Sequence, residues 1–197
     1  MPVCSGLQFA DDSTGDCVER CPEIPDLYGQ IQTKKCVEQC DPLEDIWADN
    51  ITRTCVAVCP QGSYGDNHTQ RCVDICPESE KYYGDPSTHM CVEKCPEFPE
   101  LYADNMTQTC VHVCPNETYA TPDTRVCEAP LNCTEFHFAD PYTKKCVLNC
   151  PPAQGIFANN ATQKCEIECP SDLFADNSTW SCVDVCPIDP WYFGYER

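Results

Sequence analysis

The sequence has few of the residues from which most globular proteins build a hydrophobic core. It holds 3 methionines and 8 glycines, large aliphatic residues are sparse, and 18 of its 197 residues are proline. Burial of so little apolar surface cannot offset the conformational entropy that a chain loses on folding. We therefore expect covalent cross-links to supply the missing stability.

Long apolar runs are absent as well. No stretch approaches the roughly 18 consecutive apolar residues that a transmembrane helix needs, so we expect no membrane insertion within this chain. The opening, MPVCSGLQFADD, has neither the basic region nor the apolar region of a signal peptide. We expect that a signal peptide was removed or that the sequence is a window from a longer chain.

Basic residues are scarce. Lysine and arginine number 12 against 32 aspartates and glutamates, which gives a net charge of −20. An acidic surface repels nucleic acid and anionic membranes, so we expect neither as a partner. The same surface favours cations and basic proteins.

The usual marks of a catalytic site are missing too. No Ser-His-Asp or Cys-His arrangement recurs, and no glycine-rich phosphate loop exists. We predict that the protein is no enzyme and that it has no catalytic residue and no cofactor. The four histidines occupy unrelated positions of the repeat described below, and we interpret them as exposed surface residues: His68, His89, His112 and His137.

Cysteine, by contrast, is abundant, with 21 residues, and Asn-x-Ser/Thr triplets are frequent. Both features are typical of a secreted or cell-surface glycoprotein. Good turn chemistry and chance are the alternative explanations for the triplets. The predicted N-glycosylation sites are Asn50, Asn67, Asn105, Asn116, Asn160, Asn177 and, doubtful because its middle residue is Cys133, Asn132.

A unit of about eighteen residues repeats along the chain: Cys-Val-x-x-x-Cys-Pro, an aromatic, Ala or Gly, Asp-x-x-Thr and the next cysteine. The aromatic positions are Phe9, Tyr28, Trp47, Tyr64, Tyr83, Tyr102, Tyr119, Phe138, Phe157, Phe174 and Phe193. The threonine positions are Thr14, Thr33, Thr52, Thr69, Thr88, Thr107, Thr124, Thr143, Thr162 and Thr179.

A longer period of 55 residues spans three units, so that ADNITRTCVAVCP at 48–60 returns as ADNMTQTCVHVCP at 103–115. We predict superrepeats at 1–58 (its start truncated), 59–113, 114–168 (irregular at 127–133) and a partial one at 169–197. Extrapolation of the period places a missing cysteine at position 201, which predicts a continuing array and explains the odd cysteine count. A free thiol kept for intermolecular bonding is the alternative.

Each unit is predicted to be a short, irregular β-hairpin. The aspartate would fix an Asx-turn, the small residue before it would leave room for chain reversal, and the threonine would begin the return strand. Proline after the second cysteine forbids helix continuation. We expect the aromatic to pack over the disulfide of its own hairpin, and the stacked hairpins to form an elongated rod with little or no helix.

The disulfide connectivity has two candidate patterns. Crosswise pairing repeats every two units, whereas the observed superperiod is three units, and loop closure treats all units alike. We favour loop closure, which pairs Cys4 with Cys17, Cys21 with Cys36, Cys40 with Cys55, Cys59 with Cys72, Cys76 with Cys91, Cys95 with Cys110, Cys114 with Cys127, Cys133 with Cys146, Cys150 with Cys165 and Cys169 with Cys182, and leaves Cys186 unpaired.

The pattern Cys-Val-x-x-x-Cys-Pro with Tyr-Ala-Asp-x-x-Thr-x-x-Cys resembles furin-like and growth-factor-receptor cysteine-rich repeats, as in tandem arrays on surface proteins of protists such as ciliates. The resemblance covers the whole chain and implies extracellular rods, spacers or coats. It brings no catalytic or ligand-binding residues. Three residues between paired cysteines, rather than two, depart from the family pattern and put its crosswise pairing in doubt here.

Metal sites compete with simpler explanations. The cysteine spacing permits zinc, but an oxidising compartment favours disulfides. The recurring aspartates offer too few oxygens for calcium, and we interpret them as turn caps: Asp49, Asp66, Asp85, Asp104, Asp140 and Asp176.

Three functions remain open. The first is a structural segment of an extracellular filament, surface hair or coat, with self-association and neighbouring segments of the same chain as partners. The second is a spacer or ligand-presenting ectodomain of a receptor or adhesion protein. The third is a secreted inhibitor with an exposed loop between Cys114 and Cys146.

Overall fold

The computed structural model describes residues 4–41, 45–77, 81–134 and 136–186, and in these residues the chain is almost entirely short strands. The predicted aromatic at Phe193 lies outside them. Two 3-10 helices, η3 (Pro130–Asn132) and η4 (Pro152–Gln154), are the helical elements described. The predicted fold class, a small disulfide-rich β array with little helix, is confirmed.

The described strands pair in antiparallel hairpins, and the register is given for the following nine. In chain order these are β1 (Phe9–Asp11) with β2 (Asp16–Val18), β3 (Tyr28–Gln30) with β4 (Lys35–Val37), β5 (Trp47–Asp49) with β6 (Thr54–Val56), β7 (Tyr64–Asp66) with β8 (Arg71–Val73), β9 (Tyr83–Asp85) with β10 (Met90–Val92), β13 (Tyr119–Ala120) with β14 (Cys127–Glu128), β15 (Phe138–Asp140) with β16 (Lys145–Val147), β17 (Phe157–Asn159) with β18 (Lys164–Glu166), and β19 (Phe174–Asp176) with β20 (Ser181–Val183).

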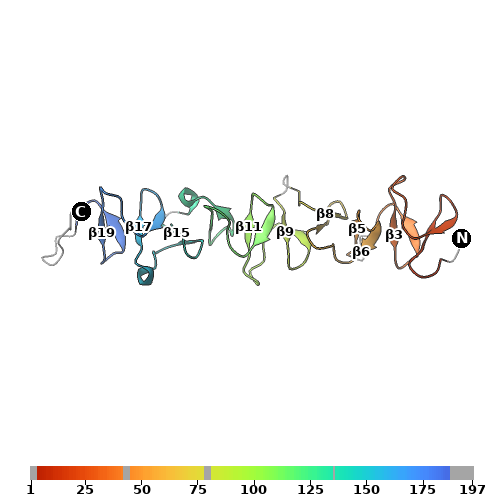
Figure 1. Cartoon of the computed structure of the whole chain (residues 1–197), viewed down its shortest axis with the longest axis horizontal. Helices are drawn as coiled ribbons and strands as arrows, with labels where there is room; N and C mark the ends of the chain where they lie inside the picture. Colours follow the sequence, from red (N-terminus) through yellow and green to blue (C-terminus); the bar gives the residue numbers. More distant parts are fainter. Residues whose placement is uncertain (1–3, 42–44, 78–80, 135, 187–197) are drawn as a thin grey trace. The chain divides into compact units, whose positions relative to one another are not determined.

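The chain forms two compact units, which comprise Met1–Pro96 with Met106–Cys110 and Glu97–Asn105 with Val111–Arg197. In the first unit the hairpins follow one another in chain order from β1–β2 to β9–β10, and β12 (Thr109–Val111) lies beside β9. In the second unit the order runs from β13–β14 to β19–β20, and Ala103 in β11 (Tyr102–Asp104) forms a bridge with Val126. Each unit is therefore a stack of hairpins (Figure 1).

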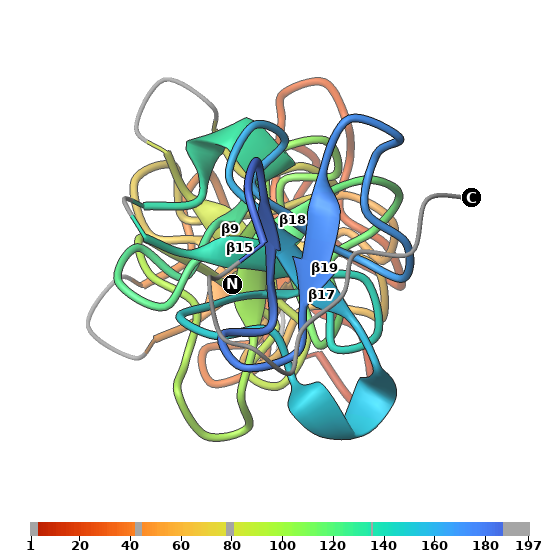
Figure 2. The same ribbon diagram turned by 90° about the vertical axis from the view of Figure 1, so that its left-hand side faces the viewer.

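The register is the same in every regular hairpin. In the first, Phe9 lies opposite Val18, Ala10 opposite Cys17 and Asp11 opposite Asp16. The small residue of the first strand thus faces the cysteine of the second. Each hairpin pairs with the next through a parallel bridge, such as that of Ala158 in β17 with Ser181 in β20. Figure 2 shows this last hairpin, by its strand β19, in front of β17.

The turns confirm the predicted Asx capping. In the third hairpin Asp49 Oδ1 accepts a hydrogen bond from the Ile51 N–H at 3.0 Å, and its Oδ2 accepts one from the Thr52 hydroxyl at 2.6 Å. The expectation that the threonine begins the return strand is wrong. Thr52 lies in the turn, and Arg53 follows with a φ of 59° before β6 begins at Thr54. This left-handed residue closes the five-residue turn, because its N–H donates to the Asp49 carbonyl.

Ten disulfides hold the hairpins, and each joins the second cysteine of one pair to the first cysteine of the next. They link Cys4–Cys17, Cys21–Cys36, Cys40–Cys55, Cys59–Cys72, Cys76–Cys91, Cys95–Cys110, Cys114–Cys127, Cys133–Cys146, Cys150–Cys165 and Cys169–Cys182. Cys186 carries a free thiol and is half-buried. The longer spacing between Cys127 and Cys133 holds η3, so the extra residues form a helical turn outside the hairpins.

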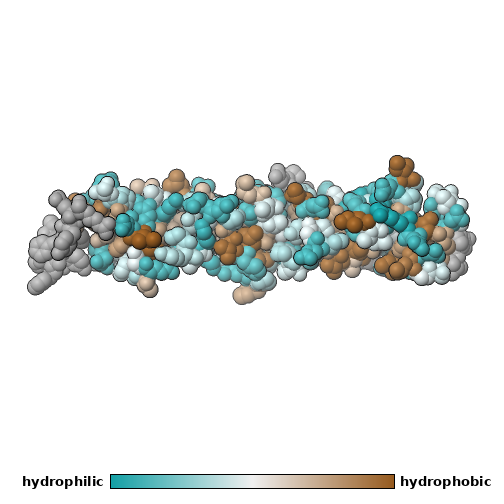
Figure 3. All heavy atoms as spheres, in the orientation of Figure 1, coloured by the Kyte–Doolittle hydropathy of each residue, from teal (hydrophilic) through white to brown (hydrophobic). Residues whose placement is uncertain are grey.

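The face of the molecule that Figure 3 shows is mixed in polarity. Figure 3 shows hydrophobic residues singly or in small groups among hydrophilic ones. None of the helices formed by the described residues has the length and hydrophobicity needed to cross a lipid bilayer.

Candidate functional site

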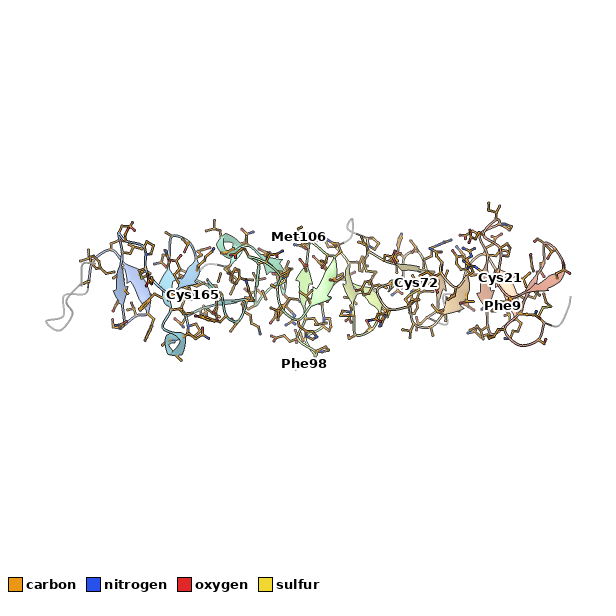
Figure 4. The ribbon with its side chains drawn as sticks, viewed as in Figure 1. Phe9, Cys21, Cys72, Phe98, Met106 and Cys165 are labelled. Carbon is orange, nitrogen blue, oxygen red and sulfur yellow. A yellow bond between two sulfur atoms is a disulfide. The ribbon has the colours of Figure 1, made fainter. Side chains whose placement is uncertain are left out.

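The feature that recurs through the structure is the joint between one hairpin and the next. The ring of Phe9, in the first hairpin, packs with Cys21 and Cys36, which form the disulfide of the second hairpin (Figure 4). Tyr28 packs in the same way on Cys40 and Cys55 of the third. Our expectation that each ring covers its own disulfide is wrong. The ring is displaced forward by one hairpin, so the small core lies between hairpins rather than within them.

The small residue in the next hairpin makes room for this ring. A Cβ on Gly29 would lie 2.6 Å from the ring of Phe9, and a Cβ on Gly65 would lie 2.6 Å from that of Trp47. Real side chains do not approach so closely. The Ala or Gly of the repeat therefore serves the preceding hairpin's ring, and not the chain reversal that we expected it to serve.

A backbone hydrogen bond locks each joint. The N–H of the small residue donates, over 2.8–2.9 Å, to the carbonyl of the left-handed residue in the next turn. The donors and acceptors are Ala10 and Lys34, Gly29 and Arg53, Ala48 and Gln70, Gly65 and His89, Gly84 and Gln108, Ala103 and Arg125, Ala120 and Lys144, Ala139 and Gln163, and Ala158 and Trp180.

All nine acceptors have φ between 53° and 59°, and none is glycine. This conformation costs a residue with a side chain about 1–2 kcal/mol. Because the conformation recurs at all nine of these joints, we infer that the contacts of each joint offset this cost. The residue types do not reveal this conformation, because Lys, Arg, Gln and Trp, which fill eight of the nine positions, are not residues that favour a positive φ.

The side chain of the left-handed residue explains why glycine is not used. At five joints it lies over the ring of the preceding hairpin and acts as its lid. The charged group lies above the ring centroid in four of these lids: Lys34 over Phe9 at 5.9 Å, Arg53 over Tyr28 at 4.2 Å, Arg125 over Tyr102 at 5.1 Å and Lys144 over Tyr119 at 4.9 Å. In the fifth, Trp180 stacks on Phe157 with 5.4 Å between the ring centroids. Cation–π attraction adds about 0.5–2 kcal/mol to each cationic lid.

At Tyr28 the joint extends over three hairpins. Arg53 comes from the next hairpin and forms a 2.7 Å ion pair with Asp26. Arg71 comes from the hairpin after that, bonds Asp26 at 2.6 Å and donates to the Tyr28 hydroxyl at 2.6 Å. These hydrogen bonds, from Arg71 first and Arg53 second, lower the pKa of Asp26 from 3.8 to about 2. Burial raises the pKa of Tyr28, whose ring is fully buried.

The second unit repeats this arrangement at Tyr102. Lys145 lies two hairpins further along the chain, pairs with Glu100 at 2.8 Å and stands 5.4 Å from the ring of Tyr102. The hydrogen bond from Lys145 lowers the pKa of Glu100. Arg125 donates to the Leu101 carbonyl at 2.7 Å, just as Arg53 does to that of Leu27. Few cations are present, and several of them are used to hold joints together.

The predicted glycosylation sites are all exposed. Five of them, Asn50, Asn67, Asn105, Asn160 and Asn177, occupy one position, directly after the last residue of the hairpin's first strand. Asn116 stands in the loop before β13, and Asn132 ends η3.

Two of the sequons also contact the preceding hairpin. The Tyr28 hydroxyl donates to Asn50 Oδ1 at 2.6 Å, and Trp47 Nε1 donates to Asn67 Oδ1 at 3.2 Å. Both bonds use the amide oxygen and leave the nitrogen, which is the atom that carries an N-glycan, outside the contact. Modification of these asparagines stays a prediction.

The residues considered for metal binding are engaged otherwise. Twenty cysteines form disulfides, and the carboxylates of Asp49, Asp66, Asp85, Asp140 and Asp176 accept hydrogen bonds from their own turns. Bonds from Ser13 and Thr179 lower the pKa of Asp11 and Asp176 respectively. Across 4–41, 45–77, 81–134 and 136–186, no group of three or more His, Cys, Asp or Glu could hold a metal ion.

The four histidines are not brought together at any joint described. His68 and His112 are exposed, His137 Nδ1 lies 2.9 Å from the Thr134 hydroxyl, and His89 is a left-handed turn residue. Two features escaped the sequence: the forward displacement of the rings and the left-handed lids. The residue after each turn threonine was a signal for the lids, because it is mostly long and often cationic.

Comparisons of the chain with protein-family models, with curated proteins and with solved structures find no match.

Proposed function

We propose that the chain is a structural segment of an extracellular, N-glycosylated, disulfide-stapled filament, surface hair or coat. The observation that carries this is the identity of the joints: ring, small residue, disulfide and left-handed carbonyl recur from hairpin to hairpin. A joint that is the same at every step lets an array grow by repetition, because each hairpin needs only its neighbours. Length is the property that a fibre or coat requires.

The cross-links support the proposed extracellular location. Disulfides in such number are typical of proteins that mature in an oxidising environment, and the exposed sequons lie where an oligosaccharide would not disturb the packing. The partners in this proposal are further segments of the same chain and other copies of it. The net charge of −20 and covalent glycans would keep neighbouring arrays hydrated.

An alternative function is supported by two exposed loop tips. Ile24 and Phe98 are 93% and 92% exposed, and each stands before a proline in one of two matching segments, EIPDLY and EFPELY (Figure 4 labels Phe98). A large apolar side chain held in water is typical of a contact surface. This favours a spacer or ligand-presenting ectodomain of a receptor or adhesion protein, as the resemblance to furin-like repeats also suggests.

Electron microscopy of the native, non-reduced material separates the two proposals. Uniform filaments whose axial repeat equals a whole number of 55-residue superrepeats are expected for the structural segment. Short dispersed particles would overturn it and favour the ectodomain.

Glycosylation is tested separately, by mass spectrometry of the chain secreted from eukaryotic cells before and after enzymatic deglycosylation. We expect glycans at Asn50, Asn105 and Asn160, with Asn50→Gln as the matched control for the mass assignment. Unmodified asparagine at all three positions would contradict the glycoprotein assignment.

A further inference from the structure

A cavity of about 200 Å³ opens in the second unit, among the hairpins β15–β16, β17–β18 and β19–β20. A cavity of about 150 Å³ is large enough for benzene, so this one admits the end of a long side chain. Its walls combine aromatic and aliphatic groups with three polar side chains: Phe138, Leu148, Cys150, Pro152, Ala158 and Trp180, and Asn149, Thr179 and Ser181.

The repeat explains why the cavity exists. In two hairpins the residue directly before the closing cysteine is a cation that reaches back two hairpins to an aromatic ring: Arg71 lies 5.2 Å from the ring of Tyr28, and Lys145 lies 5.4 Å from that of Tyr102. At Phe138 the equivalent residue is Ser181. Its short side chain bonds the Thr179 carbonyl at 3.2 Å. The space that a cation fills elsewhere is therefore left open beside Phe138.

The acidic partner of that cation is also replaced. Asp26 and Glu100 stand two residues before their aromatic rings and bind the incoming cation at 2.6 and 2.8 Å. The equivalent of these acids before Phe138 is Phe136, which is 79% exposed. The cavity thus offers ring faces and hydroxyl or amide oxygens, without the carboxylate present at Tyr28 and Tyr102.

This combination selects among cations. A plain ammonium is strongly hydrated and depends on a carboxylate, whereas guanidinium is weakly hydrated, flat, and stacks on aromatic faces. The Trp180 indole is fixed by its stacking on Phe157 at 5.4 Å, with an interplanar angle of 20°. Two aromatic walls are therefore present before any ligand arrives.

We propose that this cavity binds an arginine side chain of a basic partner protein, with the guanidinium on the face of Phe138 and its N–H groups directed to Asn149, Thr179 and Ser181. The net charge of −20 favours the approach of such a partner. The site takes from outside the cation that other joints supply from within. It does not depend on whether the chain is a filament or an ectodomain.

The test is a titration of the full chain with N-acetyl-arginine amide, followed by two-dimensional NMR of the Trp180 indole N–H and the Ser181 amide. Controls are the citrulline compound, which is neutral and nearly the same shape, and the lysine and norleucine compounds. We expect saturable shifts at these two positions, with arginine binding about fivefold or more tightly than citrulline. Equal binding of citrulline or norleucine, or shifts spread evenly over the acidic surface, would overturn the proposal.

Two variants fill or remove the site. Ser181→Arg restores the internal cation of the other joints and should abolish arginine binding, while Phe138→Leu keeps the volume apolar and should remove the preference for arginine over citrulline. Unchanged binding by Ser181→Arg would refute the assignment. Native disulfide mapping of each variant confirms that its fold is intact.

The reciprocal variant is Arg71→Ser, which should open an equivalent slot beside Tyr28 in the first unit. Guanidinium chloride at low millimolar concentration should then raise the thermal stability of Arg71→Ser by more than it raises that of the parent chain, which has only the site beside Phe138. Absence of this rescue would show that the slot beside a ring does not by itself recruit guanidinium, which contradicts the proposal.

Discussion

The indole ring of Trp47 lies directly over Gly65, the small residue of the next hairpin, so close that a Cβ on Gly65 would come 2.6 Å from the ring atom Cε2. The same ring packs on the disulfide between Cys59 and Cys72. One residue thus touches the backbone and the cross-link of its neighbour at once, which explains why the repeat allows only Ala or Gly at this position.

Gly65→Val should therefore destabilise the array by about 1–3 kcal/mol, the usual cost of forcing extra carbons into a packed core. Gly65→Ala should cost less, because Ala occupies this place under other rings. Denaturant unfolding with disulfides intact, together with Trp fluorescence, measures both effects. The control is Ile75→Val, at a side chain that is 66% exposed. Equal stability of Gly65→Val and the control would disprove the close contact.

The left-handed turn residue predicts a reversal of the usual order of Ala and Gly. Gln70 has a φ of 55°, so Gln70→Gly should be about 1 kcal/mol more stable than Gln70→Ala, although both variants lose the hydrogen bond from the Gln70 side chain to the Asn67 carbonyl. The same pair at Gln32, an exposed turn residue outside the left-handed set, should show Ala as stable as Gly or more so. Thermal unfolding of the four variants decides this, and an identical order at both sites would count against the strained turn.

The cluster at Tyr28 predicts a dependence on pH. The pKa of Asp26 is lowered to about 2 in the folded chain from an ordinary 3.8, so its stabilisation is present above about pH 4 and is lost as the pH falls toward 2. Asp26→Asn should be less stable than the parent at neutral pH and should lose less stability over that acid range. Urea titrations at several pH values measure this, with the exposed Asp172→Asn as control. Parallel pH profiles for parent and Asp26→Asn would rule out the role of this carboxylate.

Removal of one cross-link should loosen the preceding hairpin as well as its own. Replacement of Cys40 and Cys55 by serine opens a loop with a sequence separation of 15, worth about 3 kcal/mol in the chain-entropy model. It also takes away the platform on which Tyr28 packs. Hydrogen exchange should increase in β3–β4 and β5–β6, while β9–β10, which is closed by Cys76–Cys91, keeps its protection. Protection retained in β3–β4 would show that the rings do not couple hairpins in this direction.

The repeat letters were enough to predict the hairpins and the Asx capping of their turns, but not that the threonine lies within the turn. The spacing of aromatic, small residue, aspartate and cysteine leaves little choice, because three-residue strands joined by an Asx-turn and a disulfide satisfy every part of the unit. The spacing also favours loop closure for the cysteines, and the structure has loop-closing bonds.

The sequence could not predict what the rings touch. The repeat pattern is the same in every unit. It is therefore compatible with Phe9 packing on its own disulfide and equally compatible with Phe9 packing on the next one. The left-handed residues were hidden for a related reason: Arg53 and His89 have ordinary side chains, and only the carbonyl that accepts the neighbour's N–H demands their conformation.

The sequence by itself therefore determined the local structure: short hairpins that need covalent closure, because the chain has too few large apolar residues to fold otherwise. The tertiary structure alone decided how hairpins join. Contacts between Tyr28, Arg53 and Arg71 span three hairpins, and the empty counterpart of that arrangement at Phe138 and Ser181 becomes visible only when ring, lid and reaching cation are seen together in space.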